Sequence, residues 1–225
     1  NRAFYFAHSA DGIEEEKADR YRELIRKRAG HIPLQHITHQ AYFMGFEFYV
    51  NQNVLVPRQD TETLVEEALK HLGDVEKPEI LDMCTGSGCI AVSLKALGGY
   101  ARVAAADISS EALEVAEKNA GTYPVEFRQS DMFAAFEPGR DMFDVIVSNP
   151  PYIPSEVIRG LEPEVRDHEP LGALDGKEDG LYFYRILAEQ CGDFLNQGGS
   201  VYFETGHDQG AAVKTLLESH GFQDT

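Results

Sequence analysis

Apolar residues in the second half of the chain form short runs that alternate with amphipathic stretches. The runs have the length of buried strands, and the stretches between them have the period of a helix. The predicted strands cover residues 80–83, 103–106, 125–128, 143–148 and 201–204. The predicted helices cover about residues 89–97, 110–120, 181–195 and 208–220. This alternation predicts an α/β fold in which a mainly parallel sheet carries helices on both faces.

The pattern before residue 79 differs and predicts a helix, a β-hairpin and a second helix. Residues 12–29 place apolar side chains on one helical face, and Gly30 follows as a stop signal. The stretch 42–56 alternates as a hairpin would, with 51–53 as its turn. The second helix begins near Asp60 and carries an apolar stripe.

Residues 153–180 are rich in Pro, Gly and Glu and interrupt the alternation as a long loop, and loops of this length usually carry function. The expected division is a small helical element over 1–40, a hairpin linker over 41–58 and the α/β domain over 59–225. A further strand would be expected after Gly221, so the last strand or two of the sheet is predicted to be missing from this sequence.

Composition narrows the classes of partner. The chain has 225 residues, with 38 acidic against 20 basic ones and a net charge of -18, which argues against a phosphate backbone as the main partner. The three cysteines lack metal or disulfide spacing and predict reduced thiols in a cytosolic protein. The eight histidines form no metal-binding pattern, and no stretch is apolar enough to span a membrane or direct export.

The tetrapeptide Asn149, Pro150, Pro151 and Tyr152 directly follows the predicted strand 143–148. Open α/β sheets place their chemistry at this end of a strand. Two prolines stiffen the loop and remove two backbone donors, so carbonyl acceptors stay free beside an amide and an aromatic ring. Such a loop suits a planar group that bears an NH2, although a Pro-Pro pair can also simply end a strand.

Two further strand ends carry residue types that bind nucleotides. Residues 82–88 place Gly86 and Gly88 at the first strand-to-helix turn, where glycines permit close approach to a ligand. Asp107 ends the next strand, where a carboxylate can accept both hydroxyls of a ribose. Each feature alone also fits a plain turn or helix cap, but several strand ends in register are hard to obtain by chance.

The third strand end completes this set. Asp131 and Met132 follow it, and an acceptor beside a flexible thioether and the ring of Phe133 would form a slot for a purine. The sequence therefore predicts a site for an adenine nucleoside along the carboxyl edge of the sheet.

These motifs together resemble the class I S-adenosylmethionine-dependent methyltransferases, which have a Rossmann-like fold. The match narrows to the HemK or PrmC family of release-factor glutamine N5-methyltransferases through the segments 53–62, 82–90, 148–153 and 169–181. Departures from the family pattern are Cys84, where glycine is common, and Gln59 and Asp60 in place of proline and glutamate. The family also has a longer amino-terminal helical domain that docks the substrate, and residues 1–40 resemble a remnant of it.

The resemblance implies an activity, a cofactor and a partner. The cofactor would be S-adenosylmethionine, with S-adenosylhomocysteine as product, and the substrate would be the glutamine of the Gly-Gly-Gln loop of peptide chain release factors. The implied cofactor-binding residues lie at the strand ends already described: Thr85, Gly86, Ser87, Gly88, Asp107, Asp131, Met132 and Asn149. We expect a cytoplasmic monomer that contacts neither nucleic acid nor membrane.

A mechanism follows from the chemistry of an amide nitrogen, which is a poor nucleophile because its lone pair is delocalised. Orientation must supply most of the catalysis. The Asn149 side-chain oxygen and the Pro150 carbonyl are predicted to accept the two amide hydrogens while Tyr152 packs on the amide plane. No metal is needed. The predicted substrate-binding set adds Pro151 and Arg58, where Arg58 either braces the loop or forms a structural salt bridge.

Two other functions fit parts of the pattern. A nucleic-acid adenine N6-methyltransferase would present the same two hydrogens to the same loop, but it needs a cationic surface and a recognition module. A non-catalytic S-adenosylmethionine-binding subunit would have no use for an intact Asn-Pro-Pro-Tyr loop. Transfer of label to a release factor, to nucleic acid or to neither would separate the three.

Overall fold

A parallel five-stranded sheet forms the centre of the protein in the computed structural model, which describes residues 2–72, 77–98, 100 and 102–225. The strands, in spatial order, are β5 (Glu126–Gln129), β4 (Arg102–Asp107), β3 (Glu79–Met83), β6 (Phe143–Ser148) and β7 (Leu195–Phe203). The chain builds one half of the sheet outward from β3 and then returns to add β6 on its other side. This reversal is a topological switch point, where α/β sheets bind ligands at the carboxyl ends of the strands.

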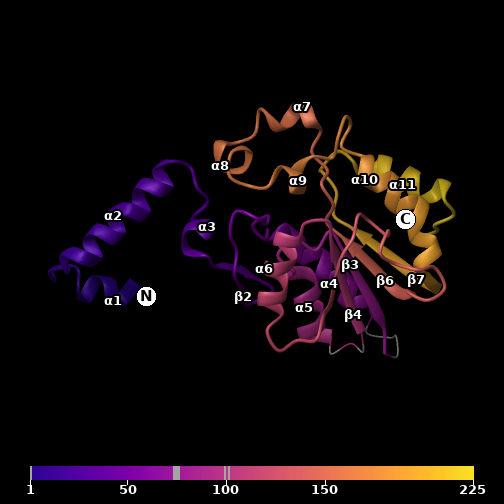
Figure 1. Ribbon diagram of the computed structural model, residues 1–225, viewed down its shortest axis with the longest axis horizontal. Coiled ribbons are helices and arrows are strands. Elements are labelled where there is room, and N and C mark those ends of the chain that lie inside the picture. Colours follow the sequence, from indigo (N-terminus) through magenta and orange to yellow (C-terminus); the bar gives the residue numbers. More distant parts are fainter. Residues whose placement is uncertain (1, 73–76, 99, 101) are drawn as a thin grey trace.

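Helices cover both faces of the sheet, as predicted (Figure 1). On one face the core includes residues of α4 (Asp60–Leu72) and α5 (Cys89–Gly98), and α6 (Ser110–Ala120) lies beside α5. On the other face the core includes α10 (Tyr182–Gln190), a 3-10 turn η1 (Cys191–Phe194) and α11 (Gly210–Ser219).

Strand β3 shows why the central strands appear in the sequence as continuous apolar runs. Ile80 points into the core beneath α4 and α5, whereas Leu81 and Met83 point into the core beneath α10 and α11. All three side chains are buried, since a parallel sheet with two covered faces has no solvent side.

The predicted strands and helices of this domain are confirmed, with small shifts of their ends except at the start of the fifth strand. Strand β7 begins earlier than predicted, at Leu195. The predicted helix 181–195 consists of α10 followed by η1, because the last turn tightens before the strand begins. Among the described residues, no helix is both long and apolar enough to cross a bilayer.

The predicted hairpin turn at 51–53 is wrong. Strands β1 (Ala41–Phe43) and β2 (Phe46–Phe48) pair closely around Met44 and Gly45, whose φ angles of 52° and 79° are both positive. Two-residue hairpin turns of the favoured type need positive φ at both central positions. The alternation beyond β2 comes instead from a loop whose valines are buried against α6, and these are Val50, Val54 and Val56.

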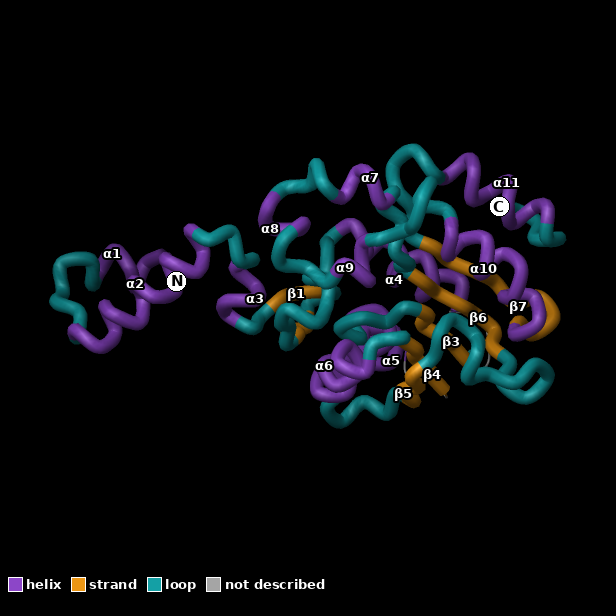
Figure 2. The backbone as a smooth tube through the Cα atoms, turned by 45° about the horizontal axis from the view of Figure 1, so that its top comes forward, coloured by secondary structure: helices purple, strands orange, loops and turns teal. Residues whose placement is uncertain are grey.

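The amino-terminal segment contains α1 (Arg2–Ala7), α2 (Glu15–Ala29) and α3 (Leu34–Thr38). The helix predicted over 12–29 is confirmed as α2, and α1 was not predicted. Helices α1 and α2 extend away from the sheet in both views of the backbone (Figures 1 and 2).

The segment 153–180 is not the plain loop that its composition predicts. It contains three one-turn helices, α7 (Ser155–Ile158), α8 (Pro163–Arg166) and α9 (Leu171–Leu174). Each starts directly after a proline or with one, and proline favours the first helical turn because its missing N–H needs no partner there.

Contacts tie this segment to the end of α2. Arg28 forms an ion pair with Glu164, and the His168 ring lies 2.9 Å from the Gly30 carbonyl oxygen. Residues 153–180 therefore bridge the amino-terminal helices and the carboxyl edge of the sheet.

Candidate active site

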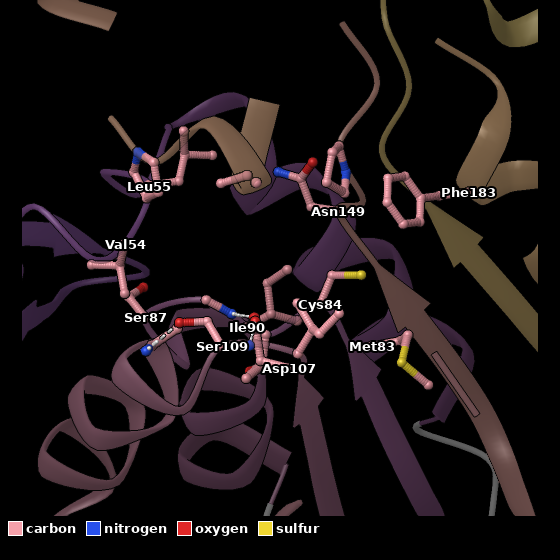
Figure 3. Close-up of a pocket in the computed structure, with 18 of the residues that line it drawn as sticks. Val54, Leu55, Met83, Cys84, Ser87, Ile90, Asp107, Ser109, Asn149 and Phe183 are labelled. Atoms are coloured by element: carbon pink, nitrogen blue, oxygen red, sulfur yellow. Dashed lines mark hydrogen bonds between the residues drawn. The ribbon is translucent and has the colours of Figure 1, made fainter. Parts of the chain in front are cut away.

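A cavity of about 290 Å³ opens at the carboxyl edge of the sheet. Figure 3 shows Val54 and Leu55 on one wall, Asn149 and Phe183 on the opposite wall, and Asp107 below them. Residues that directly follow β3, β4, β5 and β6 all contribute to its lining. The strand-end residues predicted from the sequence therefore meet in one place.

Most of the predicted cofactor-binding residues line this cavity. They are Thr85, Gly86, Ser87, Asp107, Asp131, Met132 and Asn149. Gly88 is different: it has φ 78°, and a Cβ there would lie 2.9 Å from the Ala116 Cβ of α6. Gly88 thus permits the close packing of α5 and α6 beneath the turn, while Gly86, with nothing within 4 Å of its Cβ position, faces open space.

Asp107 is fixed by the backbone around it. Its Oδ2 accepts a hydrogen bond from the Gly86 N–H at 2.8 Å, and its Oδ1 accepts one from the Ser109 N–H at 2.9 Å. Burial raises the pKa of Asp107, and these backbone hydrogen bonds oppose the rise. Each carboxylate oxygen keeps a lone pair, so the group can still accept from the vicinal hydroxyls of a ribose.

Asp82 lies beneath the glycine turn and is fully buried. Its Oδ2 accepts from the Thr85 hydroxyl at 2.6 Å and from the Ala91 N–H at 3.0 Å, while Oδ1 has no partner among the described residues. Burial raises the pKa of Asp82 to about 7. The carboxylate thus holds the turn and the first turn of α5 together at an electrostatic cost.

The third strand end also has a constrained backbone. Met132 has φ 47°, and its carbonyl oxygen accepts from the Ser130 hydroxyl at 2.6 Å. This turn directs Asp131 and Met132 to the cavity, where they offer a carboxylate and a thioether side by side.

The Asn-Pro-Pro-Tyr loop contributes only part of itself to the cavity wall. Asn149 and Pro151 line the cavity, and Pro150 and Tyr152 are not among the described residues that do. The Asn149 amide nitrogen donates to the Thr61 hydroxyl of α4 at 3.3 Å. Its side-chain oxygen therefore stays available as an acceptor.

Close packing against Gly176 and a hydrogen bond from Gln209 hold the backbone of Tyr152, the last residue of this loop. A Cβ at Gly176 would lie 2.7 Å from the Tyr152 carbonyl carbon, and the Tyr152 carbonyl oxygen accepts from the Gln209 amide at 2.9 Å. Because Gly176 has no side chain, residues 153–180 can pack closely against the Asn-Pro-Pro-Tyr loop.

Arg58 forms an ion pair with Glu169, with 2.7 Å between Nη2 and Oε1. The Glu169 side chain is 1% exposed, and its Oε2 has no partner among the described residues. Burial raises the pKa of Glu169, and the Arg58 charge opposes that rise. The pair joins the loop before α4 to the segment 153–180, and Arg58 also lines the cavity.

Sequence reasoning missed several residues of the site. The loop after the hairpin adds Val54, Leu55 and Pro57, and Phe183 of α10 adds a ring. These positions do not follow predicted strands, so no strand-end signal marks them as part of the site, although Val54, Leu55 and Pro57 lie in the segment 53–62 that carries the family resemblance. Outside this lining, Glu204 directly follows β7 and was also not predicted, although an acid that follows the fifth strand carries the same signal as Asp107.

The cavity also contains a thiol, Cys84, at φ 63°. Burial strongly raises the pKa of this half-buried thiol, which disfavours the nucleophilic thiolate. Among the described residues, no group of three or more His, Cys, Asp or Glu side chains could hold a metal ion.

Comparisons with known proteins identify methyltransferases as similar to this chain. The chain matches the family described as "Methyltransferase small domain" over residues 59–159 and the "PrmC N-terminal domain" over residues 1–38. It resembles the ribosomal protein L11 methylase from Lactobacillus delbrueckii subsp. bulgaricus, with a TM-score of 0.53, 25% identity and coverage of 74% of this chain and 71% of that one. A methyltransferase from Pyrococcus furiosus shares the fold at a TM-score of 0.56 and 18% identity, with coverage of 91% and 87%.

The fold and the site define a class I S-adenosylmethionine-dependent methyltransferase. Among curated relatives, the release factor glutamine methyltransferase of Bacillus cereus is 40% identical over 97% of this chain and 79% of its own length. That of Geobacter sulfurreducens is 41% identical over 90% of this chain and 71% of its own length. The chain belongs to the family of release factor glutamine methyltransferases.

Proposed function

We propose that the protein transfers a methyl group from S-adenosylmethionine to the side-chain amide nitrogen of the glutamine in the Gly-Gly-Gln loop of peptide chain release factors. One observation carries the proposal: Asn149 lies on the cavity wall with its amide nitrogen bound to Thr61, which leaves its oxygen as an acceptor. The names of the relatives from Bacillus cereus and Geobacter sulfurreducens support this choice of substrate.

The cavity fits the cofactor. Its lining is formed by residues at the strand ends, and Asp107 offers free lone pairs at the level of the glycine turn. In this proposal Thr85, Gly86 and Ser87 hold the methionine end of the cofactor. Asp107 takes the ribose, and Asp131 with Met132 takes the adenine. Gly88 acts by allowing α5 to pack closely rather than by contact.

When bound, S-adenosylmethionine supplies an electrophilic sulfonium methyl group. The Asn149 oxygen and the Pro150 carbonyl accept the two hydrogens of the glutamine amide, which turns the nitrogen lone pair toward the methyl group. Both acceptors gain strength as positive charge develops on the nitrogen. Tyr152 supplies the surface on which the amide plane packs, and Pro151 keeps the loop stiff. The protonated amide product is strongly acidic and loses its proton to water without a dedicated base.

Arg58 has a supporting role in this proposal. Its ion pair with Glu169 holds residues 153–180 over the site, which would position the partner's loop. The two roles considered for Arg58, bracing the loop and forming a structural salt bridge, then coincide: the salt bridge braces the loop.

The segments before the methyltransferase domain have roles in binding the partner and in linking it to the site. We propose that residues 1–40 dock the release factor, which the match of residues 1–38 to the PrmC N-terminal domain supports. Residues 41–58 link this element to the methyltransferase domain over 59–225. The net charge of -18 favours a basic protein surface over nucleic acid. We further propose a monomer that works in the cytoplasm, and its three free cysteines suit a reducing compartment.

Labelled S-adenosylmethionine tests the proposal. The protein is offered a release factor, the same factor with the Gly-Gly-Gln glutamine replaced by alanine, and bulk tRNA or DNA in separate reactions. We expect label only in the intact release factor. Label in nucleic acid alone would establish the adenine methyltransferase instead, and no label anywhere with the cofactor bound would establish a non-catalytic subunit.

A further inference from the structure

Glu204 directly follows β7, the strand next to β6. Ser148 pairs with Phe203 across the two strands, and the Glu204 N–H donates to the Ser148 carbonyl oxygen at 3.0 Å. Glu204 therefore lies beside Asn149 at the carboxyl edge. Its own carbonyl oxygen accepts from the buried Tyr184 hydroxyl at 2.6 Å, which fixes the strand end in place.

The Glu204 carboxylate faces three polar side chains of the site, Thr61, Asn149 and Tyr152. Its Oε2 is buried and has no hydrogen-bond partner among the described residues. Burial raises the pKa of Glu204, the three polar side chains oppose the rise, and the nearby Asp60 carboxylate adds to it. A half-buried acid next to the Asn149 amide, whose Oε2 is fully buried and unpaired within the described part of the chain, calls for an explanation.

The reason lies in the symmetry of an amide. A half turn of the Asn149 side chain exchanges its oxygen and its nitrogen at little steric cost. By itself the Thr61 hydroxyl can donate as well as accept and tolerates both orientations, but when the Glu204 carboxylate takes its one hydrogen it can only accept from Asn149. An ionised carboxylate only accepts, so it holds the amide nitrogen on its own side and turns the oxygen toward the cavity.

We propose that Glu204 is a positioning residue that fixes the Asn149 amide in the orientation that accepts the substrate N–H. The inference rests on the proposed function, because the orientation matters only for a substrate that donates from nitrogen. In the reversed orientation Asn149 would present an N–H to the substrate N–H, and the amide would be turned away from the methyl group.

The proposal predicts an acidic limb in the pH profile. When Glu204 takes up a proton, its hydroxyl donates to Asn149 and favours the reversed orientation. The groups that face or lie near Glu204 are Asp60 of α4, Tyr152, Tyr184 of α10 and Cys89 of α5, and of these Asp60 is the one carboxyl group. The fall in activity on the acidic side should occur at a higher pH than the ordinary pKa of a glutamate, because burial raises the pKa of Glu204.

The test compares Glu204→Gln with the wild-type chain and with Glu189→Gln, which changes an exposed glutamate on α10. Glutamine keeps the size of the side chain but can donate as well as accept. We expect Glu204→Gln to lower kcat about 10- to 100-fold, as loss of a hydrogen bond to a charged group does. Cofactor affinity by calorimetry should stay within about twofold, and the acidic limb should disappear. Glu189→Gln should match the wild type.

Several results would overturn the proposal. Near-normal kcat in Glu204→Gln, or an acidic limb that persists in it, would show that Glu204 does not orient Asn149. Thr61→Val provides a second readout should Glu204→Gln fail to fold: its loss of kcat should be smaller than about 10-fold, because the Glu204 carboxylate still faces the Asn149 amide directly. A large loss there would assign the role to Thr61.

The outcomes also separate this inference from the proposed function. A wild-type chain that methylates the Gly-Gly-Gln glutamine, together with an equally active Glu204→Gln, would reject Glu204 alone. A wild-type chain that binds the cofactor and leaves that glutamine unmodified would reject the function and, with it, the inference.

Discussion

Asp82 combines full burial with a carboxyl oxygen that has no partner among the described residues, and this should make the stability of the protein depend on pH. Its pKa is about 7 in the folded chain, against 3.8 as the ordinary value. The folded state therefore holds the proton more tightly than the unfolded state. The contribution of protonated Asp82 to the free energy of unfolding is fully present below about pH 3.8. It is lost as the pH rises through about 7.

Asp82→Asn tests this at the residue scale. Asparagine cannot ionise, so the free energy of unfolding should depend less on pH between about 4 and 7 in the variant than in the wild type. Urea unfolding at a series of pH values measures it, with Asp193→Asn, an exposed acid on η1, as the control. An unchanged slope in Asp82→Asn would mean that the buried carboxyl group does not carry the raised pKa.

Asn149 is the residue on which catalysis depends most in this account. Asn149→Ala removes the acceptor and should lower turnover by about 10²- to 10³-fold, as loss of a preorganised electrostatic group does. Cofactor affinity should change by only a few fold, since strand ends other than β6 supply most of the lining. Single-turnover transfer and calorimetry measure the two effects.

The control for that variant is Asn196→Ala. Asn196 also makes one side-chain hydrogen bond, to Asp144, but at the start of β7 and so at the opposite edge of the sheet. Its replacement should leave turnover unchanged. Equal losses in both variants would indicate a general effect on folding.

At the scale of elements, the packing of α5 against α6 depends on Gly88. Gly88→Ala brings a Cβ to 2.9 Å from the Ala116 Cβ at a positive φ, so both overpacking and backbone strain act. We expect a loss of about 2–4 kcal/mol in the free energy of unfolding. Gly45→Ala has a similar φ of 79° but nothing within 4 Å, so it should lose about 1–2 kcal/mol from strain alone. Urea unfolding distinguishes the two, and equal losses would exclude the clash.

The strands and helices of the α/β domain could be predicted because each has a clear pattern of apolar residues, either a continuous run or a helical period. Strand β6 is buried on both faces, and its apolar run reads directly from the sequence. The hairpin could not be predicted correctly, because the valines at 50, 54 and 56 alternate through burial against α6 and not through strand pairing. The helices within 153–180 escape prediction because a single turn has no period to detect.

At the scale of the whole molecule, the Arg58–Glu169 pair and the Arg28–Glu164 pair both fasten the segment 153–180 to the rest of the chain. They differ in burial. The Glu169 side chain is 1% exposed, whereas the Arg28 and Glu164 side chains are 42% and 35% exposed.

Arg58→Ala leaves a buried carboxylate without its partner and should lower the free energy of unfolding by about 1–3 kcal/mol, less than a fully buried pair would because Arg58 itself is partly exposed. Arg28→Ala should cost below about 1 kcal/mol. Urea unfolding measures both. Amide exchange should also quicken over 153–180 in Arg58→Ala, and equal effects of the two variants would show that burial of Glu169 does not matter.

The site could be predicted only where it follows strand ends. Asp107 and Asn149 follow predicted strands, and the parallel order of the sheet brings their ends together. The partners that refine the site come from elsewhere: Thr61 from α4 and Glu169 from the segment 153–180. Their positions depend on how loops and helices dock, which a single sequence does not encode as a periodic signal.

Localisation of the transferred methyl group tests the central claim most directly. The protein, S-adenosylmethionine and a release factor are incubated, and the peptide that contains the Gly-Gly-Gln loop is fragmented in a mass spectrometer, with Asn149→Ala in parallel. We expect one added methyl group on the glutamine side chain with the wild-type protein and almost none with Asn149→Ala. A methyl group on another residue, or equal methylation by both proteins, would contradict it.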